Sequence, residues 1–372
     1  YDGELVEAIG AEAAASGIPA GKKGERRPEL DHGTMIPLRF FCQSCGGLPI
    51  VRIGLSGLPL LEHYNFGTAI ARAAERLGRR PVVVASGDLS HKLKADGPYG
   101  FAPEGPEFDR RIMEIFSSGD FGAMLEFNPV FCEKAAECGL RSFVIMAGAF
   151  DGYDVESEIL SYEGPFGVGY GVACFAPRAV DEGRRFERSF LQRERETLRQ
   201  TAAREDAYVK LARLSLEHYV KSGRVAGLPD GLPEELTKRR AGVFVSVTIA
   251  GELRGCIGTI EPTRSSVAEE ILYNAVSAGT RDPRFAPVTE AELPRLVYDV
   301  DVLSPAEPAA KDDLDVRRYG VIVSSGRRKG LLLPDLDGVD TVERQLDIAL
   351  RKAGIGRGEN YSLQRFEVVR HR

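Results

Sequence analysis

A charged segment divides the sequence into two halves that have different patterns. Residues 178–204, RAVDEGRRFERSFLQRERETLRQTAAR, are dense in charge and almost free of branched apolar side chains. Such a run is typical of a solvated helix that links two domains. Because one hydrophobic core seldom serves 372 residues, we expect two domains, at 1–177 and 203–372, joined by a charged linker helix at 178–202.

Composition excludes several classes of protein. The chain is 43% hydrophobic and 28% charged, with a net charge of −6, so nothing favours binding to nucleic acid or to a membrane. No apolar run approaches the roughly 20 residues of a membrane span, and the first residues lack the pattern of a signal peptide. Six cysteines are too few for a disulfide scaffold, and the CxxC of Cys42 and Cys45 has no second ligand pair. We therefore expect a cytoplasmic protein with reduced cysteines.

In the first half, predicted strands alternate with a predicted helix, as in an α/β domain. Apolar runs at 49–56 and 81–88 read as strands on either side of a helical pattern at 62–78. Further predicted elements are helices near 107–118 and 131–148, followed by strands at 155–162 and 167–176.

The second half has the pattern of an α+β domain. An amphipathic helix at 206–220 opens it, and residues 242–260 read as two strands joined by a glycine-containing hairpin. Later predicted elements are strands at 296–303, 319–325 and 329–334, and helices at 265–278 and 340–353. Strand pairs mixed with helices are typical of α+β folds.

Two histidines of the first half are candidate catalytic residues. His91 follows the apolar run at 81–88 through a turn, which is where open α/β sheets bind their ligands. His32 lies between an acid and a glycine, which permits another group to approach the backbone closely. The alternative for each is a hydrogen-bonded surface histidine. His63, at the start of a helical pattern, is expected to cap or pack.

Three motifs of the first half carry a family resemblance. DHGTMIPLRF, SGDLSHKL and ECGLRSFVIMAGAFDGY occur in this order and resemble the LigB-type class III extradiol ring-cleavage dioxygenases and their Memo-like relatives. The resemblance covers residues 1–177. It implies that His91 is the acid/base residue and that His32 orients the substrate. Because the chain starts at Tyr1, we expect that it begins inside this domain.

The same resemblance implies an iron(II) site. Two histidine ligands are expected upstream of residue 1, and the third ligand, a carboxylate, matches Glu137. Memo-like proteins have a cysteine near this point, so Cys138 is the rival. The plain alternative is that Glu137 lies on a helix surface beside a buried Cys138.

Two functions follow from this assignment. Iron(II) held by imidazoles and a carboxylate keeps open positions where a catecholate and dioxygen can bind together. A histidine with a pKa near 6.5 could then exchange the phenolic proton. The first expectation is an oxidoreductase that opens a small aromatic diol. The second is a Memo-like scaffold without catalytic activity.

The second half resembles a different family. LRGCIGTIEP, RDPRFAPVT and YGVIVSSGRRKGLLLP are similar to motifs of the AMMECR family, over residues 203–372. A LigB/Memo-like domain followed by an AMMECR domain resembles the fusion family called AmmeMemoRadiSam system protein A. This resemblance implies a radical-SAM protein as partner.

Cys256 is the candidate nucleophile of the second half. It follows Arg254 by two residues, and a cationic neighbour favours a thiolate. Small flanking residues permit a ligand to approach, but most free cysteines are buried packing residues, which is the alternative. Arg281, Asp282 and Arg284 could form an anion-binding rim or an ordinary surface ion-pair cluster.

Overall fold

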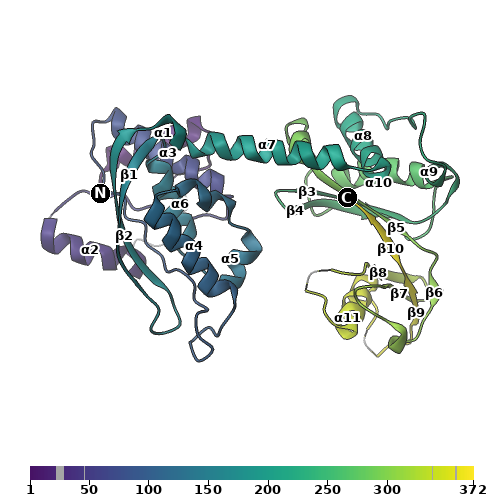
Figure 1. Cartoon of the computed structure of the whole chain (residues 1–372). Coiled ribbons are helices and arrows are strands. Elements are labelled where there is room, and N and C mark those ends of the chain that lie inside the picture. The colour runs from purple at the N-terminus through teal and green to yellow at the C-terminus, as the bar shows by residue number, and fades with distance from the viewer. Residues whose placement is uncertain (22–28, 46, 337, 357) are drawn as a thin grey trace. The chain divides into compact units, whose positions relative to one another are not determined.

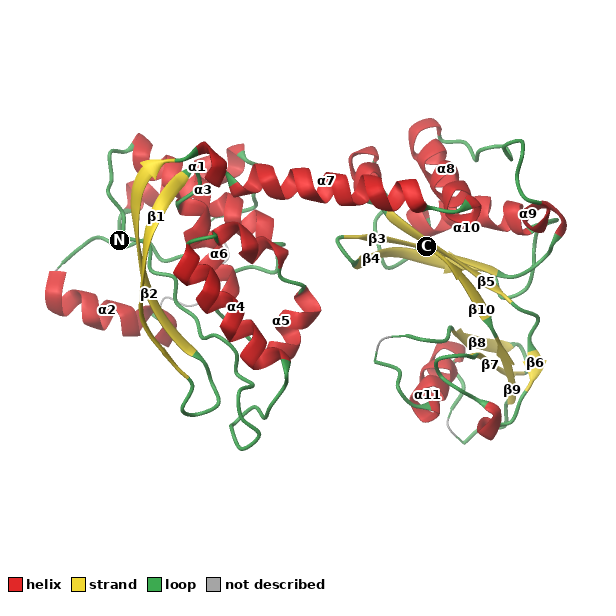
Figure 2. Ribbon diagram, in the orientation of Figure 1, coloured by secondary structure: helices red, strands yellow, loops and turns green. Residues whose placement is uncertain are grey.

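The computed structural model divides the chain into two compact units, Tyr1–Arg193 and Glu194–Arg372 (Figure 1). It describes residues 1–21, 29–45, 47–336, 338–356 and 358–372, without the side chains of Ser44 and Cys45. Both units combine helices with strands (Figure 2), as the sequence predicts, and the strands pair antiparallel. No helix in these ranges is long and apolar enough to cross a membrane.

Unit 1, Tyr1–Arg193, is mainly helical. Its helices are α1 (Gly3–Ala15), α2 (His32–Cys45), α3 (Leu60–Arg76), α4 (Glu104–Ser118), α5 (Pro129–Ala135) and α6 (Leu140–Ala149), with short 3-10 helices η2 (Phe121–Glu126) and η3 (Glu182–Arg184). Strands β1 (Tyr153–Glu163) and β2 (Tyr170–Val180) form an antiparallel ribbon, which confirms the two strands expected there. Phenylalanines from α4, η2 and α6 form the centre of the core.

Helices α3 and α6 cross at two glycines. A Cβ atom at Gly148 would lie 1.9 Å from the carbonyl oxygen of Tyr64, and one at Gly67 would lie 2.0 Å from that of Ile145. No real side chain tolerates such distances, so the two helices pack backbone against backbone. The position of α6 therefore depends on the absence of side chains at the crossing.

The two apolar runs expected as strands at 49–56 and 81–88 are not strands, so the β-α-β interpretation is wrong for them. Neither has regular secondary structure over most of its length, and neither joins a strand ladder with another segment that the structure describes. The side chains of Val82 and Val84 are 77% and 49% exposed. A strand requires a neighbour to satisfy its backbone groups, and the apolar pattern alone does not supply one.

The prediction of one helix at 131–148 is also wrong, because this segment forms two helices, α5 and α6. Ala136 ends α5 with a left-handed φ of 54°, and α6 begins at Leu140. Between them a short turn carries Glu137, Cys138 and Gly139. The break places candidate ligands on a turn, where their side chains are free to converge on another segment.

Helix α7 (Phe186–Arg204) crosses the boundary between the units. Strand β2 continues to Val180 and a turn capped by Asp181 follows, so the helix begins at Phe186 and not at 178. No residue of α7 is buried, which agrees with its charged sequence.

Unit 2, Glu194–Arg372, contains two four-stranded antiparallel sheets. The first has the order β10-β5-β3-β4 and the second the order β6-β9-β7-β8. The strands are β3 (Val243–Ile249), β4 (Glu252–Gly258), β5 (Val297–Leu303), β6 (Glu307–Pro308), β7 (Gly320–Ser325), β8 (Arg328–Leu332), β9 (Ser362–Phe366) and β10 (Val368–His371). The helices are α8 (Ala207–Ser222), α9 (Glu234–Lys238), α10 (Val267–Thr280) and α11 (Val342–Ala353), with 3-10 helices η4 (Glu290–Arg295) and η5 (Lys311–Asp313).

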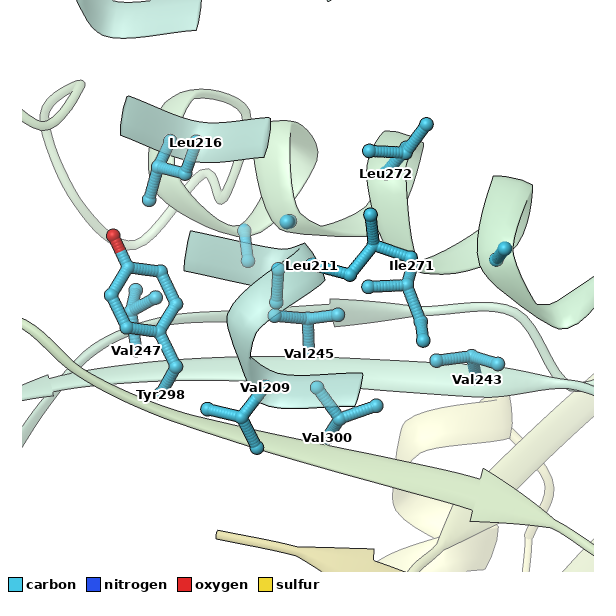
Figure 3. Packing of buried hydrophobic residues seen from close by; sticks show 14 of the residues in the cluster. Val209, Leu211, Leu216, Val243, Val245, Val247, Ile271, Leu272, Tyr298 and Val300 are labelled. Atoms are coloured by element: carbon cyan, nitrogen blue, oxygen red, sulfur yellow. The ribbon is translucent and has the colours of Figure 1, made fainter. Parts of the chain in front are cut away.

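One face of the first sheet is covered by α8 and α10. Val243, Val245 and Val247 alternate along β3 and are fully buried against Leu211 and Ile271 (Figure 3). The amphipathic helix, the β3–β4 hairpin and the later strands and helices that the sequence predicts are confirmed. β6, β9 and β10 were not predicted.

We expect Gly148→Ala to destabilise unit 1. The added methyl group must displace the backbone of α3, and overpacking of this kind costs about 1–3 kcal/mol in the free energy of unfolding. Denaturant unfolding of the full chain measures the change. Gly10→Ala on α1 is the matched control, because its Cβ meets open space and a helical alanine should slightly stabilise the chain. Equal effects of both substitutions would contradict the proposed crossing.

Candidate functional site

The turn that carries His91 is anchored by a buried carboxylate. Asp109, on α4, is 1% exposed and accepts a 2.7 Å hydrogen bond from the backbone N–H of Ser90. Its second oxygen accepts one of 2.8 Å from the hydroxyl of Tyr162. Burial raises the pKa of Asp109, and the two donors counteract that effect.

The backbone of the same turn is paired with the chain just before β2. The N–H of Leu89 donates to the carbonyl of Gly169, and the N–H of Gly169 donates to the carbonyl of Ser90. The Ser90 hydroxyl donates to the carbonyl of Ala135 at 2.8 Å. The turn is thus fixed on three sides, by α4, by α5 and by the approach to β2.

Two glycines bring this turn against the turn between α5 and α6. A Cβ atom at Gly87 would lie 2.4 Å from the Cα of Gly139. The N–H of Asp88 donates to the sulfur of Cys138 at 3.2 Å, and the N–H of Cys138 donates to the carbonyl of Asp88 at 3.4 Å. The close approach therefore joins two segments that are far apart in the sequence.

Asp88, His91 and Cys138 converge at this contact. Their ligand atoms all lie within 4.8 Å of one another. The imidazole Nε2 of His91 lies 3.3 Å from Asp88 Oδ2 and 3.8 Å from Cys138 Sγ. Asp88 and His91 are partly buried and Cys138 is exposed, so the cluster is open to solvent.

These three donors suit a divalent metal ion. Bonds of 2.0–2.3 Å to nitrogen, oxygen and sulfur place neighbouring tetrahedral ligands roughly 3.3–3.7 Å apart, close to the spacing of the cluster. An imidazole, a carboxylate and a thiolate together are donors for iron or zinc. Burial raises the pKa of the Cys138 thiol, whereas the N–H of Asp88 lowers it.

Glu137 does not join this cluster. Its Oε2 accepts a 2.7 Å hydrogen bond from the N–H of Leu140, so it caps the first turn of α6. Burial raises the pKa of Glu137. Of the two rival ligands, the structure brings Cys138 and not Glu137 to His91. The alternative expectation of a buried Cys138 is wrong, because Cys138 is exposed.

The other histidines occupy different positions. His32 is the first residue of α2 and is exposed, and a Cβ atom at the adjacent Gly33 would lie 3.7 Å from Ser86 Oγ. The start of α2 is therefore near the site but not in the cluster. His63 is buried and bonds the carbonyl of Pro59 through Nδ1, which confirms a packing histidine.

Two acidic residues of the site were missed from the sequence. Asp88 lies three residues before His91 in the same motif, and this spacing could have indicated that the two side chains lie close together. Asp109 gave no signal, because it is an ordinary acid within a helical pattern. The ring of Tyr99, also missed, stacks on His91 with centroids 5.0 Å apart.

In unit 2, the N–H of Cys256 donates to Asp282 at 2.9 Å, and Arg284 forms an ion pair with the same carboxylate at 2.6 Å. Arg254 instead bonds Glu292, at 2.7 Å. The cationic side chain beside Cys256 is therefore Arg284 and not Arg254. Arg281 is exposed. The side chain of Cys45 lies outside the described residues, and Cys42 is exposed on α2.

The comparisons with known proteins identify both halves. The family described as "Catalytic LigB subunit of aromatic ring-opening dioxygenase" matches residues 1–173, and the AMMECR1 family matches residues 209–371. The chain belongs to the family of two-domain proteins in which a LigB domain precedes an AMMECR1 domain.

The relatives match either most of the chain or slightly less than half of it. Protein CA_C1420 of Clostridium acetobutylicum is 44% identical over 345 residues, which are 92% of this chain and 73% of that protein. A Thermotoga maritima protein is 51% identical over 171 residues, 45% of this chain and 98% of that protein. In a solved structure, the uncharacterized protein PH0010 of Pyrococcus horikoshii is 32% identical, with a TM-score of 0.42, over 44% of this chain and 88% of that one.

We expect Glu137→Ala to destabilise the chain without removing any member of the cluster. Loss of a helix-capping oxygen typically costs about 0.5–2 kcal/mol in the free energy of unfolding. Denaturant unfolding measures the loss. Glu133→Ala is the matched control, since Glu133 is exposed on α5 and its side chain has no hydrogen bond with another residue that the structure describes. A Glu137 variant as stable as the control would contradict the capping role.

Proposed function

We propose that unit 1 is a metal-dependent oxidoreductase domain of the extradiol type, with iron(II) held by Asp88, His91 and Cys138. The observation that carries this proposal is the convergence of three donors of different chemistry in a domain that matches the LigB family. Iron(II) bound there would bring a catecholate and dioxygen into contact. The donor set differs from two histidines and a carboxylate, because a thiolate supplies one position.

The protein's own side chains take distinct roles in this proposal. His91 is a ligand through Nε2, which lies nearest to both other donors, and the same atom cannot also carry the substrate proton. Tyr99, stacked on His91 and exposed, offers a flat apolar surface to an aromatic ring. His32, exposed at the start of α2 where the adjacent Gly33 lies near Ser86, is assigned to orient the substrate.

Metal content of variants tests the ligand set. We expect His91→Ala, Asp88→Asn and Cys138→Ser each to lower iron(II) affinity at least about tenfold, because losing one of few ligands leaves the ion weakly held. Anaerobic titration of the full chain measures affinity, and cobalt(II) substitution reports the thiolate by its charge-transfer absorption. Cys174→Ser is the matched control, an exposed cysteine on β2.

If His91 is a proton carrier and not a ligand, the metal content of the His91 variant will not fall. If His91 carries the proton, His91→Ala will keep its metal and lose turnover, typically by about 10²–10⁴-fold. Loss of iron from a Glu137→Ala protein, with retention in Cys138→Ser, would reverse the choice of ligand. Ring cleavage of catechol by the iron-loaded chain tests the activity itself, and no cleavage by a loaded, folded protein would contradict the dioxygenase assignment.

A partner-binding role is the second candidate, with a radical-SAM protein as partner. The observation that favours it is the exposed apolar surface of α2, where Phe40 is 67% exposed and Ile36 56% exposed. We expect Phe40→Glu to weaken complex formation with that partner in a co-purification assay. Its metal content should stay unchanged, because the side chain lies outside the cluster. Undiminished complex formation would argue against α2 as the contact.

A further inference from the structure

Unit 2 consists of two lobes that have separate cores. The first lobe, residues 205–303 and 368–372, contains the sheet β10-β5-β3-β4, and the second lobe, residues 307–366, contains the sheet β6-β9-β7-β8 (Figure 1). The core of the first lobe is built from residues 207–302, and that of the second lobe from residues 314–363. Each lobe therefore has its own hydrophobic core, which is the property of a part that can move as a rigid body.

The chain passes between the lobes at two adjacent places. β5 leads through Ser304 into β6, and β9 leads through Glu367 into β10. Two hydrogen bonds join these passages: the N–H of Ser304 donates to the carbonyl of Glu367, and the N–H of Glu367 donates to the hydroxyl of Ser304, each at 2.9 Å. Two neighbouring connections of this kind form a hinge, about which one lobe can turn against the other.

The apolar contact between the lobes is a small cluster beside the hinge. Its buried members are Leu303 of the first lobe and Ile322, Leu331 and Phe366 of the second. Leu303 and Phe366 directly precede the two hinge residues in the sequence. Because parts of a chain move relative to one another unless the interface between them is large and apolar, this small cluster permits motion and places its pivot at the hinge.

An ion pair joins the lobes at the opposite edges of the two sheets. The connecting strands, β5 and β10 in one sheet and β6 and β9 in the other, occupy one side of each sheet, so β4 and β8 are the far edges. Lys329, on β8, lies 2.7 Å from Glu261, which follows β4. The two side chains are 34% and 79% exposed, so the pair is weak. Arg318 also pairs with Glu367, but at the hinge itself.

The thiol of Cys256 lies on the face of the first sheet that the second lobe contacts. Phe244, on β3, packs against the cluster between the lobes, on the face away from α8 and α10. Ser246 is two residues further along the strand and therefore lies on the same face. Cys256 is its partner across the strands, on the edge strand β4, and is half-buried. Its exposure therefore depends on how closely the second lobe approaches.

We propose that unit 2 is a clamp, whose two lobes open about the hinge at Ser304 and Glu367 and are held closed by the ion pair between Lys329 and Glu261. The apolar cluster beside the hinge keeps the lobes joined while the far edges separate. Opening uncovers the face of the first sheet that carries Cys256, and closing covers it again. An exposed ion pair is weak enough to break and re-form, so the two forms interconvert. The clamp is independent of the function proposed for unit 1.

The alkylation rate of Cys256 tests the clamp. The thiol is half-buried, and burial raises its pKa, so iodoacetamide should react with it mainly in the open form. In the full chain with Glu261→Gln, the rate at constant pH should rise roughly 1.5- to fivefold, the factor by which loss of an exposed ion pair shifts an opening equilibrium. Peptide mass spectrometry resolves each cysteine, and Cys256→Ser should lose the signal.

Glu234→Gln is the matched control, because Glu234 forms an ion pair of the same length, 2.7 Å, with Lys238 inside α9 of the first lobe. It should leave the rate unchanged. Exchange of the two charges, by Lys329→Glu combined with Glu261→Lys, should restore the slow rate, because the pair forms again in the opposite sense. Far-ultraviolet circular dichroism shows that each variant is folded.

Salt provides a second measurement on the same chains. In about 1 M sodium chloride, which screens an exposed pair, the unsubstituted chain should react nearly as fast as Glu261→Gln, whose own rate should change little. Equal rates for Glu261→Gln and the unsubstituted chain, an equal rise in Glu234→Gln, no effect of salt, or no recovery on charge exchange would each overturn the latch. Alkylation of Cys256 only after denaturation would overturn the clamp itself.

Discussion

The hydrogen bond from the Ser90 amide to Asp109 is the interaction on which the candidate metal site depends. Burying a carboxylate is costly unless donors compensate it, and Asp109 has two, the amide and the Tyr162 hydroxyl. The bond fixes the turn between Asp88 and His91. The two acids therefore have opposite roles: Asp109, on α4, has both oxygens engaged by hydrogen bonds within the protein, whereas Asp88, in the turn, is partly exposed beside His91.

A chain of close backbone contacts places the third donor. Gly67 and Gly148 let α6 pack directly on α3, which sets where α6 begins. Cys138 lies immediately before that first turn, and Gly139 lets it approach Gly87 on the opposite segment. Since each contact excludes even a methyl group, the separation of Cys138 from His91 is decided by packing far from the site. Glu137 contributes by holding the helix end, which explains an acid beside the cluster that is not part of it.

Periodic patterns predicted the parts of the fold whose partners are local. The β3–β4 hairpin needs only Ala250 and Gly251 in left-handed conformations, and the short loop brings the strands together. The run at 81–88 is equally apolar, yet a strand there would need a distant neighbour that its own sequence does not encode. His91 and Cys138 were recognisable from motifs. The contact between them could not be predicted, because it depends on the close approach of Gly87 and Gly139, and no sequence pattern shows that these two glycines meet.

Cys138 and Cys256 show how the neighbours of a cysteine decide what its thiol can do. Cys138 faces an imidazole and a carboxylate, and burial of the thiol opposes its ionisation, so a thiolate there is stable only when a cation is bound between them. Cys256 instead lies beside a carboxylate that is already paired, because its N–H donates to Asp282 and Asp282 forms an ion pair with Arg284. The first arrangement is therefore suited to hold a metal ion. In the parts of the chain that the structure describes, Cys256 belongs to no such group of ligands, so the two cysteines differ in what their neighbours allow them to bind.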